Sequence, residues 1–357
     1  MESRTKRTLI AIGASIALLA GGAVFAAPPF EGAEYCAECH PGQYNDWKVS
    51  GHPYKLRNGD VAQFAPLPLP EGYTWDDISY VIGGYKWKSR YMDRDGFIIT
   101  SVRTPDGEVP GHNQYNMMTG RWVDYHAGEE KPYDCGRCHT TGYSPEGHQD
   151  GLPGIIGTWE FGGIQCEECH GPGDEMSVDT SAAACGRCHS RGEFDTIPAK
   201  GGFIRHHEQY NEMLASPHSW ANCVTCHDPH KKAEFSIERT CEDCHDDIAA
   251  AYAPTRMAGV GVDCIDCHMP YASKSAEALG PNTGDVRTHL FRIETDPAYR
   301  MFTEDGAFVN LDPSGQGAVT IDFACMGCHR NVDRDTLARE AENFHDKPLR
   351  VIRAVAR

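Results

Sequence analysis

The sequence predicts a chain of short α-helices and loops with one small antiparallel β insertion, at about residues 75–125. Three observations lead to this fold class. The five-residue pattern Cys-x-x-Cys-His occurs eight times in 357 residues. The chain also holds 37 glycines and 22 prolines, which interrupt regular secondary structure. The longest stretch free of cysteine, 66–132, is rich in aromatic and β-branched residues, which favour strands.

The repeated pattern uses all 16 cysteines. Its two thiols lie one helical turn apart and can add to the two vinyl groups of a haem, while the adjacent His binds the iron. A disulfide framework needs no His after every second Cys, and a zinc site would leave these histidines unexplained. The sequence therefore predicts eight covalently attached c-type haems. The attachment residues are Cys36, Cys39, Cys135, Cys138, Cys166, Cys169, Cys185, Cys188, Cys223, Cys226, Cys241, Cys244, Cys264, Cys267, Cys325 and Cys328. The iron-binding residues are His40, His139, His170, His189, His227, His245, His268 and His329.

Residues 1–26 have the features of a secretory signal peptide, with basic residues, then an apolar run and small residues before a cut after Ala26. The alternative is an uncleaved N-terminal anchor. Export suits thioether attachment, which takes place outside the cytoplasm. The mature chain is therefore expected in the periplasm or outside the cell, with no membrane span after cleavage.

Cleavage would leave 30 basic and 50 acidic residues, a net charge of −20. A surface this acidic repels nucleic acid and favours redox partners that carry a basic docking patch. The alternative is that the acidity only keeps an exported protein soluble.

Two haem-bearing regions are expected, at 27–190 and 191–357, with the β insertion at about 66–132 inside the first. Within the insertion, 77–82 and 85–88 are predicted strands, and 90–92 and 97–100 flank the hairpin turn Asp95-Gly96. Its aromatic residues Trp75, Tyr85, Trp87 and Trp122 are expected to form its own core.

The N-terminal region has a recognisable pattern. Residues 27–32 precede the first motif, Trp47 and His52 follow it, and the third motif lies in Gln165-Cys-Glu-Glu-Cys-His-Gly-Pro-Gly173. Over about 27–175 this resembles the tetrahaem cytochrome c that accepts electrons from hydroxylamine oxidoreductase. The resemblance implies closely stacked haem pairs, with His52 as a distal ligand on a helix that continues from the first motif. The long β insertion departs from that family. After Gly-Pro-Gly a His is common in multihaem cytochromes, whereas Met176 is a candidate here.

The C-terminal region begins with a helix expected over 205–216, and its fifth motif continues into Cys226-His-Asp-Pro-His230. This resembles the repeat unit of multihaem electron conduits, including decahaem cytochromes. The resemblance implies that His218 and His230 are distal ligands. A charged helix is expected over 333–345. His289 and His345 are further candidates, with an ordinary surface histidine as the alternative.

Eight irons need eight sixth ligands if every haem is six-coordinate. Ten histidines lie outside the motifs, and the favoured set is His52, His126, one of His206 and His207, His218, His230, His289 and His345. The eighth position is left to His112, His148, the other member of the adjacent pair, Met176, or no protein ligand. A filled position permits only electron transfer, whereas an open one can bind a small molecule.

Three functions follow. The first is an electron carrier with mostly bis-His haems, in a respiratory chain or in extracellular electron transfer. The second is an octahaem oxidoreductase that acts on nitrite, hydroxylamine or a sulfur oxyanion at one five-coordinate haem, although every motif keeps its His. The third is a homo-oligomer or filament that shares haem ligands. The sequence contains no phosphate loop, nucleophile elbow or His-Glu-x-x-His motif.

Overall fold

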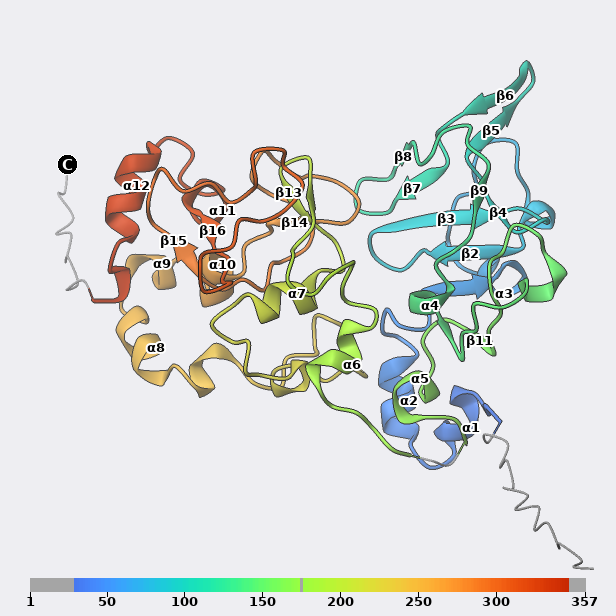
Figure 1. Ribbon diagram of the computed structural model, residues 1–357, viewed down its shortest axis with the longest axis horizontal. Coiled ribbons are helices and arrows are strands. Elements are labelled where there is room, and N and C mark those ends of the chain that lie inside the picture. Colours follow the sequence, from blue (N-terminus) through green and yellow to red (C-terminus); the bar gives the residue numbers. More distant parts are fainter. Residues whose placement is uncertain (1–28, 174–175, 347–357) are drawn as a thin grey trace, which may run out of the picture.

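The computed structural model describes residues 29–173 and 176–346, so the expected signal peptide lies outside the described residues. Figure 1 shows two lobes side by side. One holds the N-terminal helices and the β sheet, and the other holds the C-terminal half. Within the described ranges, no helix has both the length and the apolar character needed to cross a membrane.

The first haem motif lies between two short helices, α1 (Ala33–Ala37) and α2 (Pro41–Trp47). Pro41 is the first residue of α2, where its missing N–H is not needed. The helix ends at Trp47, so the expected continuous helix to His52 is wrong. Turns follow through Ser50, Gly51 and Pro53.

The predicted β insertion is an antiparallel sheet of seven strands within the described residues. Its strand order is β1-β2-β3-β4-β9, and β7 pairs with β3 and with β8. The strands are β1 (Leu56–Asn58), β2 (Tyr80–Gly83), β3 (Lys88–Met92), β4 (Phe97–Ile98), β7 (Gln114–Asn116), β8 (Arg121–Val123) and β9 (Lys131–Pro132). A separate hairpin, β5 (Ser101–Thr104) and β6 (Gly107–Pro110), projects from this lobe (Figure 1).

The hairpin at Asp95-Gly96 forms as predicted, with Met92 opposite Ile98 and Gly96 at φ +84°. Residues 85–87 form the turn between β2 and β3, so the strand expected at 85–88 is wrong. Helices α3 (Gly59–Ala62) and η1 (Trp75–Asp77) complete the lobe. Trp75 and Trp122 pack against its core, as expected.

The remaining expected core aromatics make different contacts. Trp87 donates a hydrogen bond from Nε1 to the Asp285 carbonyl (3.1 Å), and Tyr85 stacks on Tyr54. Trp87 therefore ties the β lobe to the C-terminal half.

Between the β insertion and the C-terminal half, the sequence forms only short elements. They are α4 (Gly136–His139), β10 (Thr140–Thr141), η2 (Gln149–Gly151), β11 (Phe161–Gly162), α5 (Glu167–His170) and α6 (Ala182–Gly186). The buried Glu167 carboxylate accepts hydrogen bonds from the backbone N–H groups of Glu31, Gly32 and Gly173, each at 2.8 Å. These hydrogen bonds hold the segment before the first haem motif against the third haem motif.

The C-terminal half also consists of short helices and strand pairs around one apolar cluster that includes Phe203, Leu290 and Phe323. The predicted helix at 205–216 begins only at Gln209, because β13 includes Arg205. The charged helix occupies Arg334–Ala341, capped by the Asp333 side chain, which accepts from the Thr336 N–H. The elements are β12 (Ala199–Lys200), β13 (Phe203–Arg205), α7 (Gln209–Leu214), η4 (Cys223–Thr225), η5 (Cys241–Asp243), α8 (Asp246–Tyr252), α9 (Arg256–Gly259), α10 (Cys264–His268), β14 (Ser273–Lys274), β15 (Ile293–Glu294), β16 (Val319–Thr320), α11 (Ile321–Ala324), α12 (Arg334–Ala341) and η6 (Phe344–Asp346).

Candidate functional site

The Cys-x-x-Cys-His motifs fold into single helical turns. In the first, fourth and fifth motifs, for example, the His N–H donates to the carbonyl of the first Cys, at 2.9, 2.9 and 3.0 Å. Such a turn places both thiols on one side and sets the imidazole directly after them. No disulfide links any of the sixteen cysteines, all of which lie in the described residues.

Five motif histidines each face a second imidazole that comes from elsewhere in the chain. Two imidazole nitrogens on opposite sides of one iron, each about 2 Å from the metal, place the ring centres about 6 Å apart. The observed separations match that geometry, so the residues present fit bis-His haems. The histidine pairs are His170–His230 (6.1 Å), His189–His207 (6.2 Å), His218–His245 (6.0 Å), His227–His289 (6.3 Å) and His268–His345 (5.9 Å).

Hydrogen bonds at Nδ1 orient several of these rings. The Nδ1 of His268 donates to the Phe291 carbonyl at 2.8 Å, that of His230 lies 2.8 Å from Asp228 Oδ1, and that of His227 lies 3.1 Å from Ser236 Oγ. A partner at Nδ1 fixes the ring and leaves Nε2 free to bind a metal.

Neighbouring motifs lie close together in space. Burial, and then the adjacent Cys36 thiol, raise the pKa of Cys166, which places the first motif beside the third. Other thiols interact between motifs and order the motifs in one series with a branch at the fourth. Cys138 and Cys188 share a hydrogen bond, as do Cys185 and Cys223. In the remaining pairs the charge of one thiol contributes, after burial, to raising the pKa of the other, and these pairs are Cys169–Cys185, Cys226–Cys244, Cys241–Cys264 and Cys267–Cys328.

The second motif, which ends at His139, has a different environment. No histidine ring pairs with His139 among the described residues, where its nearest ring contact is Tyr133 at 6.4 Å. Its Nδ1 is buried without a hydrogen-bond partner. Burial lowers the pKa of His139 to about 3, so the imidazole is neutral, as iron binding requires. The charges that lower this pKa further are those of Lys55, Arg90, Lys88 and Arg191.

These four cations form what we call the cation cluster. Lys88 and Arg90 alternate on β3 and therefore project from the same face of the strand. Burial, and then Arg90, lower the pKa of Lys88 to about 7. Lys88 Nζ donates to the Ser275 carbonyl at 2.7 Å, and the Arg90 guanidinium lies 3.5 Å from the ring centre of Tyr125.

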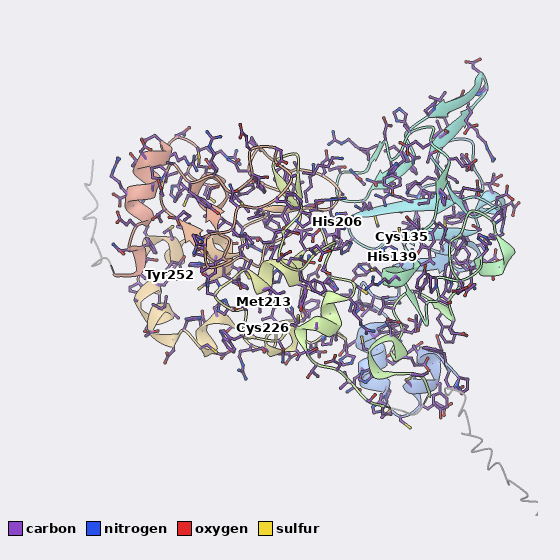
Figure 2. The ribbon with its side chains drawn as sticks, viewed as in Figure 1. Cys135, His139, His206, Met213, Cys226 and Tyr252 are labelled. Carbon is purple, nitrogen blue, oxygen red and sulfur yellow. The ribbon has the colours of Figure 1, made fainter. Side chains whose placement is uncertain are left out.

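His206 lies against two members of this cluster. Its Nε2 lies 3.2 Å from Arg191 Nη2 and 3.5 Å from Lys88 Nζ. Because Nε2 faces these donors, it accepts a hydrogen bond, and His207 is the member of the adjacent pair that faces a motif histidine. Figure 2 shows His206 near Cys135 and His139, where the β lobe meets the C-terminal half.

The other candidate ligands lie in other surroundings. His52 is enclosed, and its pKa is lowered to about 3 by burial and then by His189. His126 is partly exposed, with Nδ1 2.7 Å from Glu129 Oε2. The Nδ1 of His148 donates to the Ile155 carbonyl at 2.5 Å, and the backbone N–H of His112 donates to Asp124 Oδ1. The Met176 side chain is 61 % exposed. In the described ranges, none of the four histidine rings in this group pairs with the ring of a motif histidine. His40 and His329 also lack such a pair, and both are exposed.

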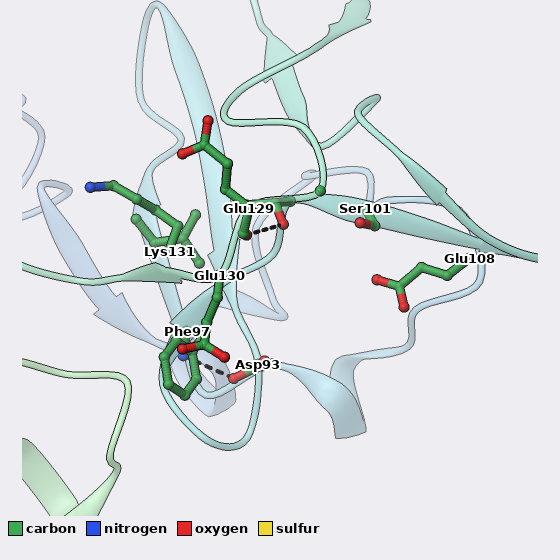
Figure 3. Close-up of a pocket in the computed structure, with 10 residues that line it drawn as sticks. Asp93, Phe97, Ser101, Glu108, Glu129, Glu130 and Lys131 are labelled. Carbon is green, nitrogen blue, oxygen red and sulfur yellow. Dashed lines mark hydrogen bonds between the residues drawn. The ribbon is translucent and has the colours of Figure 1, made fainter.

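A surface cavity of about 270 Å³ lies elsewhere, on the β lobe (Figure 3). Asp93, Glu108, Glu129 and Glu130 line it, with Lys131 beside them. Its acidic lining repels anions, in contrast to the surroundings of His139.

The cation cluster is not predicted by the sequence. Its one local signal is the alternation of Lys88 and Arg90 within a strand that is otherwise buried. Lys55 and Arg191 join the cluster only through the tertiary fold.

Comparison with known proteins agrees with the motifs and the fold. The family model of cytochrome c3 matches residues 160–246, and that of cytochrome c554 and c-prime matches 111–171. The dissimilatory sulfite reductase MccA of Wolinella succinogenes is 21% identical and aligns with 88% of this chain. The chain spans only 63% of the length of that relative.

Two solved structures are similar to this fold. The Wolinella succinogenes octahaem sulfite reductase MccA has a TM-score of 0.65 at 18% identity, covering 84% of this chain and 65% of that one. The outer cell wall cytochrome OcwA has a TM-score of 0.56 at 18% identity, covering 87% and 86%. The chain is thus a multihaem c-type cytochrome with covalently bound haem. The expected fold class, short helices and loops with a small antiparallel insertion, is confirmed.

Proposed function

We propose that this protein is an exported octahaem oxidoreductase that reduces a small oxyanion at the haem attached to Cys135 and Cys138. One observation carries the proposal. Five motif histidines face a second imidazole at about 6 Å, whereas enclosed His139 has the cation cluster around it. A haem iron with a free sixth position can bind a small ligand and pass electrons to it.

The positive charge of the cation cluster favours binding of an anionic substrate. Bringing four cations together in a largely enclosed region is costly unless anions compensate them. The carboxylates of a bound haem would neutralise part of this charge, and an oxyanion substrate would neutralise the remainder. Arg90 and Arg191 offer planar forks that suit an oxyanion, with Arg90 held by Gln114 Oε1 at 2.8 Å and Arg191 held by His206.

The lysines suit proton delivery. Reduction of an oxyanion to a hydride consumes protons as well as electrons. The pKa of Lys88, about 7, lets its ammonium donate a proton near neutral pH and take another from water. Lys55, whose pKa burial also lowers, is the second such group near His139.

Sulfite is the substrate that we propose. The relative that aligns with most of this chain is named as a sulfite reductase, and a sulfur oxyanion is among the substrates expected from the sequence. Nitrite, also an oxyanion, and hydroxylamine, which is neutral, are the competing substrates. Sulfite carries more negative charge than nitrite and therefore gains most from four surrounding cations.

Electron transfer, the first expectation from the sequence, is part of this function. Support comes from the thiol interactions, which order the motifs in a series that branches at the fourth motif toward the second. Haems held by the seven other motifs would pass electrons along this series to a haem held by His139. We further propose that the acidic surface docks a basic redox partner outside the cytoplasm.

Electron paramagnetic resonance of the oxidised holoprotein tests the proposal. We expect one high-spin haem whose signal shifts with sulfite or cyanide, together with sulfite-dependent oxidation of reduced methyl viologen. If all haems are low-spin and sulfite and cyanide leave them unchanged, the protein is an electron carrier only. A shift with nitrite and none with sulfite would replace the substrate and keep the site.

A further inference from the structure

A chain of aromatic rings runs from His139 away from the cation cluster to the surface of the β lobe. Tyr133 contacts His139 with ring centres 6.4 Å apart, and Trp159 lies 5.9 Å from Tyr133. Tyr80 lies 5.6 Å from Trp159, edge to face. The Tyr80 hydroxyl donates to Asp150 Oδ2 at 2.5 Å, and Asp150 is exposed.

Two features of this chain exceed what core packing requires. The Tyr133 side chain is fully buried and its hydroxyl has no hydrogen-bond partner, although a Phe would fill the same space without desolvating a polar group. Tyr80 is only 6% exposed, yet its hydroxyl reaches a carboxylate at the surface. Tyr and Trp are the side chains that lose an electron most readily apart from Cys and Met, and a phenol does so more easily when a base takes its proton.

From this geometry we infer that Tyr133, Trp159 and Tyr80 form a relay that carries oxidising equivalents from the His139 haem to the protein surface. The inference rests on the proposed function, because it needs a haem at His139 that small molecules can reach. A haem of that kind also reacts with peroxide.

The electron balance is as follows. Hydrogen peroxide takes two electrons and two protons and becomes two molecules of water. When the protein is fully oxidised, neighbouring haems would have no electron to give, so one electron would come from the haem iron at His139 and the other from the side chains. Tyr80 loses the second electron through Trp159 and Tyr133, its phenolic proton moves to Asp150, and the two protons that peroxide consumes come from the solvent. Two molecules of an external thiol then return one electron each, one to Tyr80 and one to the haem iron, and join as a disulfide. Their two protons go to the solvent, and the proton on Asp150 returns to Tyr80.

The contacts determine the direction of the relay. Successive ring centres are 5.6–6.4 Å apart, so each electron transfer is short compared with a direct transfer from Tyr80 to the haem. Tyr80 is the last member of the relay, and its hydroxyl has a proton acceptor in Asp150. The radical is therefore expected to reside on Tyr80. The relay spares the haem and the cation cluster from oxidation.

The test uses the oxidised holoprotein mixed with hydrogen peroxide and frozen for electron paramagnetic resonance. We expect a tyrosyl radical in the unmodified protein and loss of most of that signal in Tyr80→Phe and in Trp159→Phe. Asp150→Asn should slow radical formation, because the proton acceptor is lost. Bleaching of the haem absorbance by peroxide should be faster in all three variants.

Trp75→Phe is the matched control, because Trp75 contacts Tyr91 and lies outside the relay. It should leave the radical yield unchanged. Equal radical yields in Tyr80→Phe, Trp159→Phe and the unmodified protein would overturn the relay. Cyanide binding measured on the same samples separates the two claims. A protein that binds cyanide and forms no radical contradicts only the relay, whereas one that binds no cyanide contradicts the proposed function as well.

Discussion

Two histidines of the same motif type, His139 and His227, lie in opposite surroundings. His227 faces His289 at 6.3 Å and has Nδ1 3.1 Å from Ser236 Oγ. His139 has no histidine opposite it in the described residues, a buried Nδ1 without a partner, and the cation cluster nearby. The motif is identical in both places, so the difference lies entirely in what the rest of the chain brings to the other side.

The surroundings of a motif histidine, and not the motif itself, therefore decide between electron transfer and reduction of an anion. A second imidazole holds the iron geometry nearly constant when the charge changes, which favours fast electron transfer. Buried cations stabilise negative charge on a bound molecule and supply protons, which favours reduction of an anion. The four predictions below test whether these environments act separately.

The largest expected effect follows from removing one buried cation. Lys88→Met keeps the length of the side chain and removes its charge and proton. We expect kcat/KM for sulfite to fall about 100-fold, as for other preorganised donors at reaction centres. Lys86→Met is the matched control, since Lys86 lies two residues earlier and is exposed. Comparable activity in both variants would show that the cluster does not serve the reaction.

A second variant removes the imidazole opposite one motif histidine, so that this histidine, like His139, has no second imidazole facing it but has no cation cluster around it. His289→Ala removes the imidazole that faces His227. We expect a new high-spin signal that responds to cyanide, and sulfite turnover about tenfold slower, equivalent to about 1.4 kcal/mol of barrier. The new site should not reduce sulfite when Lys88→Met is also present. If the double variant reduces sulfite as fast as His289→Ala alone, an open haem is sufficient without the cations.

A smaller effect is expected from replacing one planar guanidinium group by an ammonium group of the same charge. Arg191→Lys keeps the positive charge and loses the planar fork beside His206. We expect KM for sulfite to rise about fivefold with kcat nearly unchanged, because substrate binding weakens uniformly. Steady-state kinetics would measure both values. A fall in kcat with constant KM would instead assign Arg191 to the chemical step.

Ionic strength should affect reduction by a redox partner and turnover of sulfite to different extents. Raising the ionic strength from low to physiological should slow reduction by a basic redox partner about threefold, because exposed charges are screened. Sulfite turnover with a small artificial donor should change less, because the cations near His139 are enclosed. Equal sensitivity of both rates would contradict the proposed acidic docking surface.

The sequence predicted the haem attachment pattern and most of the β insertion, because both depend on local signals. The Asp95-Gly96 hairpin needs only a glycine at positive φ between two strand-forming segments. The predicted ligands His207, His218, His230, His289 and His345 all lie in histidine pairs. Their partners could not be predicted, since His230 faces His170, a motif histidine 60 residues earlier.

The cation cluster could not be predicted for a similar reason. Lys55 precedes β1, Lys88 and Arg90 lie on β3, and Arg191 follows the fourth motif. Only the tertiary fold brings these segments together. His126 is one of the histidines favoured as ligands by the sequence. It lies in a turn at φ +49° with Glu129 as its partner. Its role as a ligand stays an untested prediction.

The hydrogen bond from Trp87 to the Asp285 carbonyl joins segments 198 residues apart, and the bond from Lys88 to Ser275 lies next to it. The two halves of the chain therefore share one wall of the region around His139. Either half taken alone would lack part of this wall, even with each of its haem-binding motifs intact.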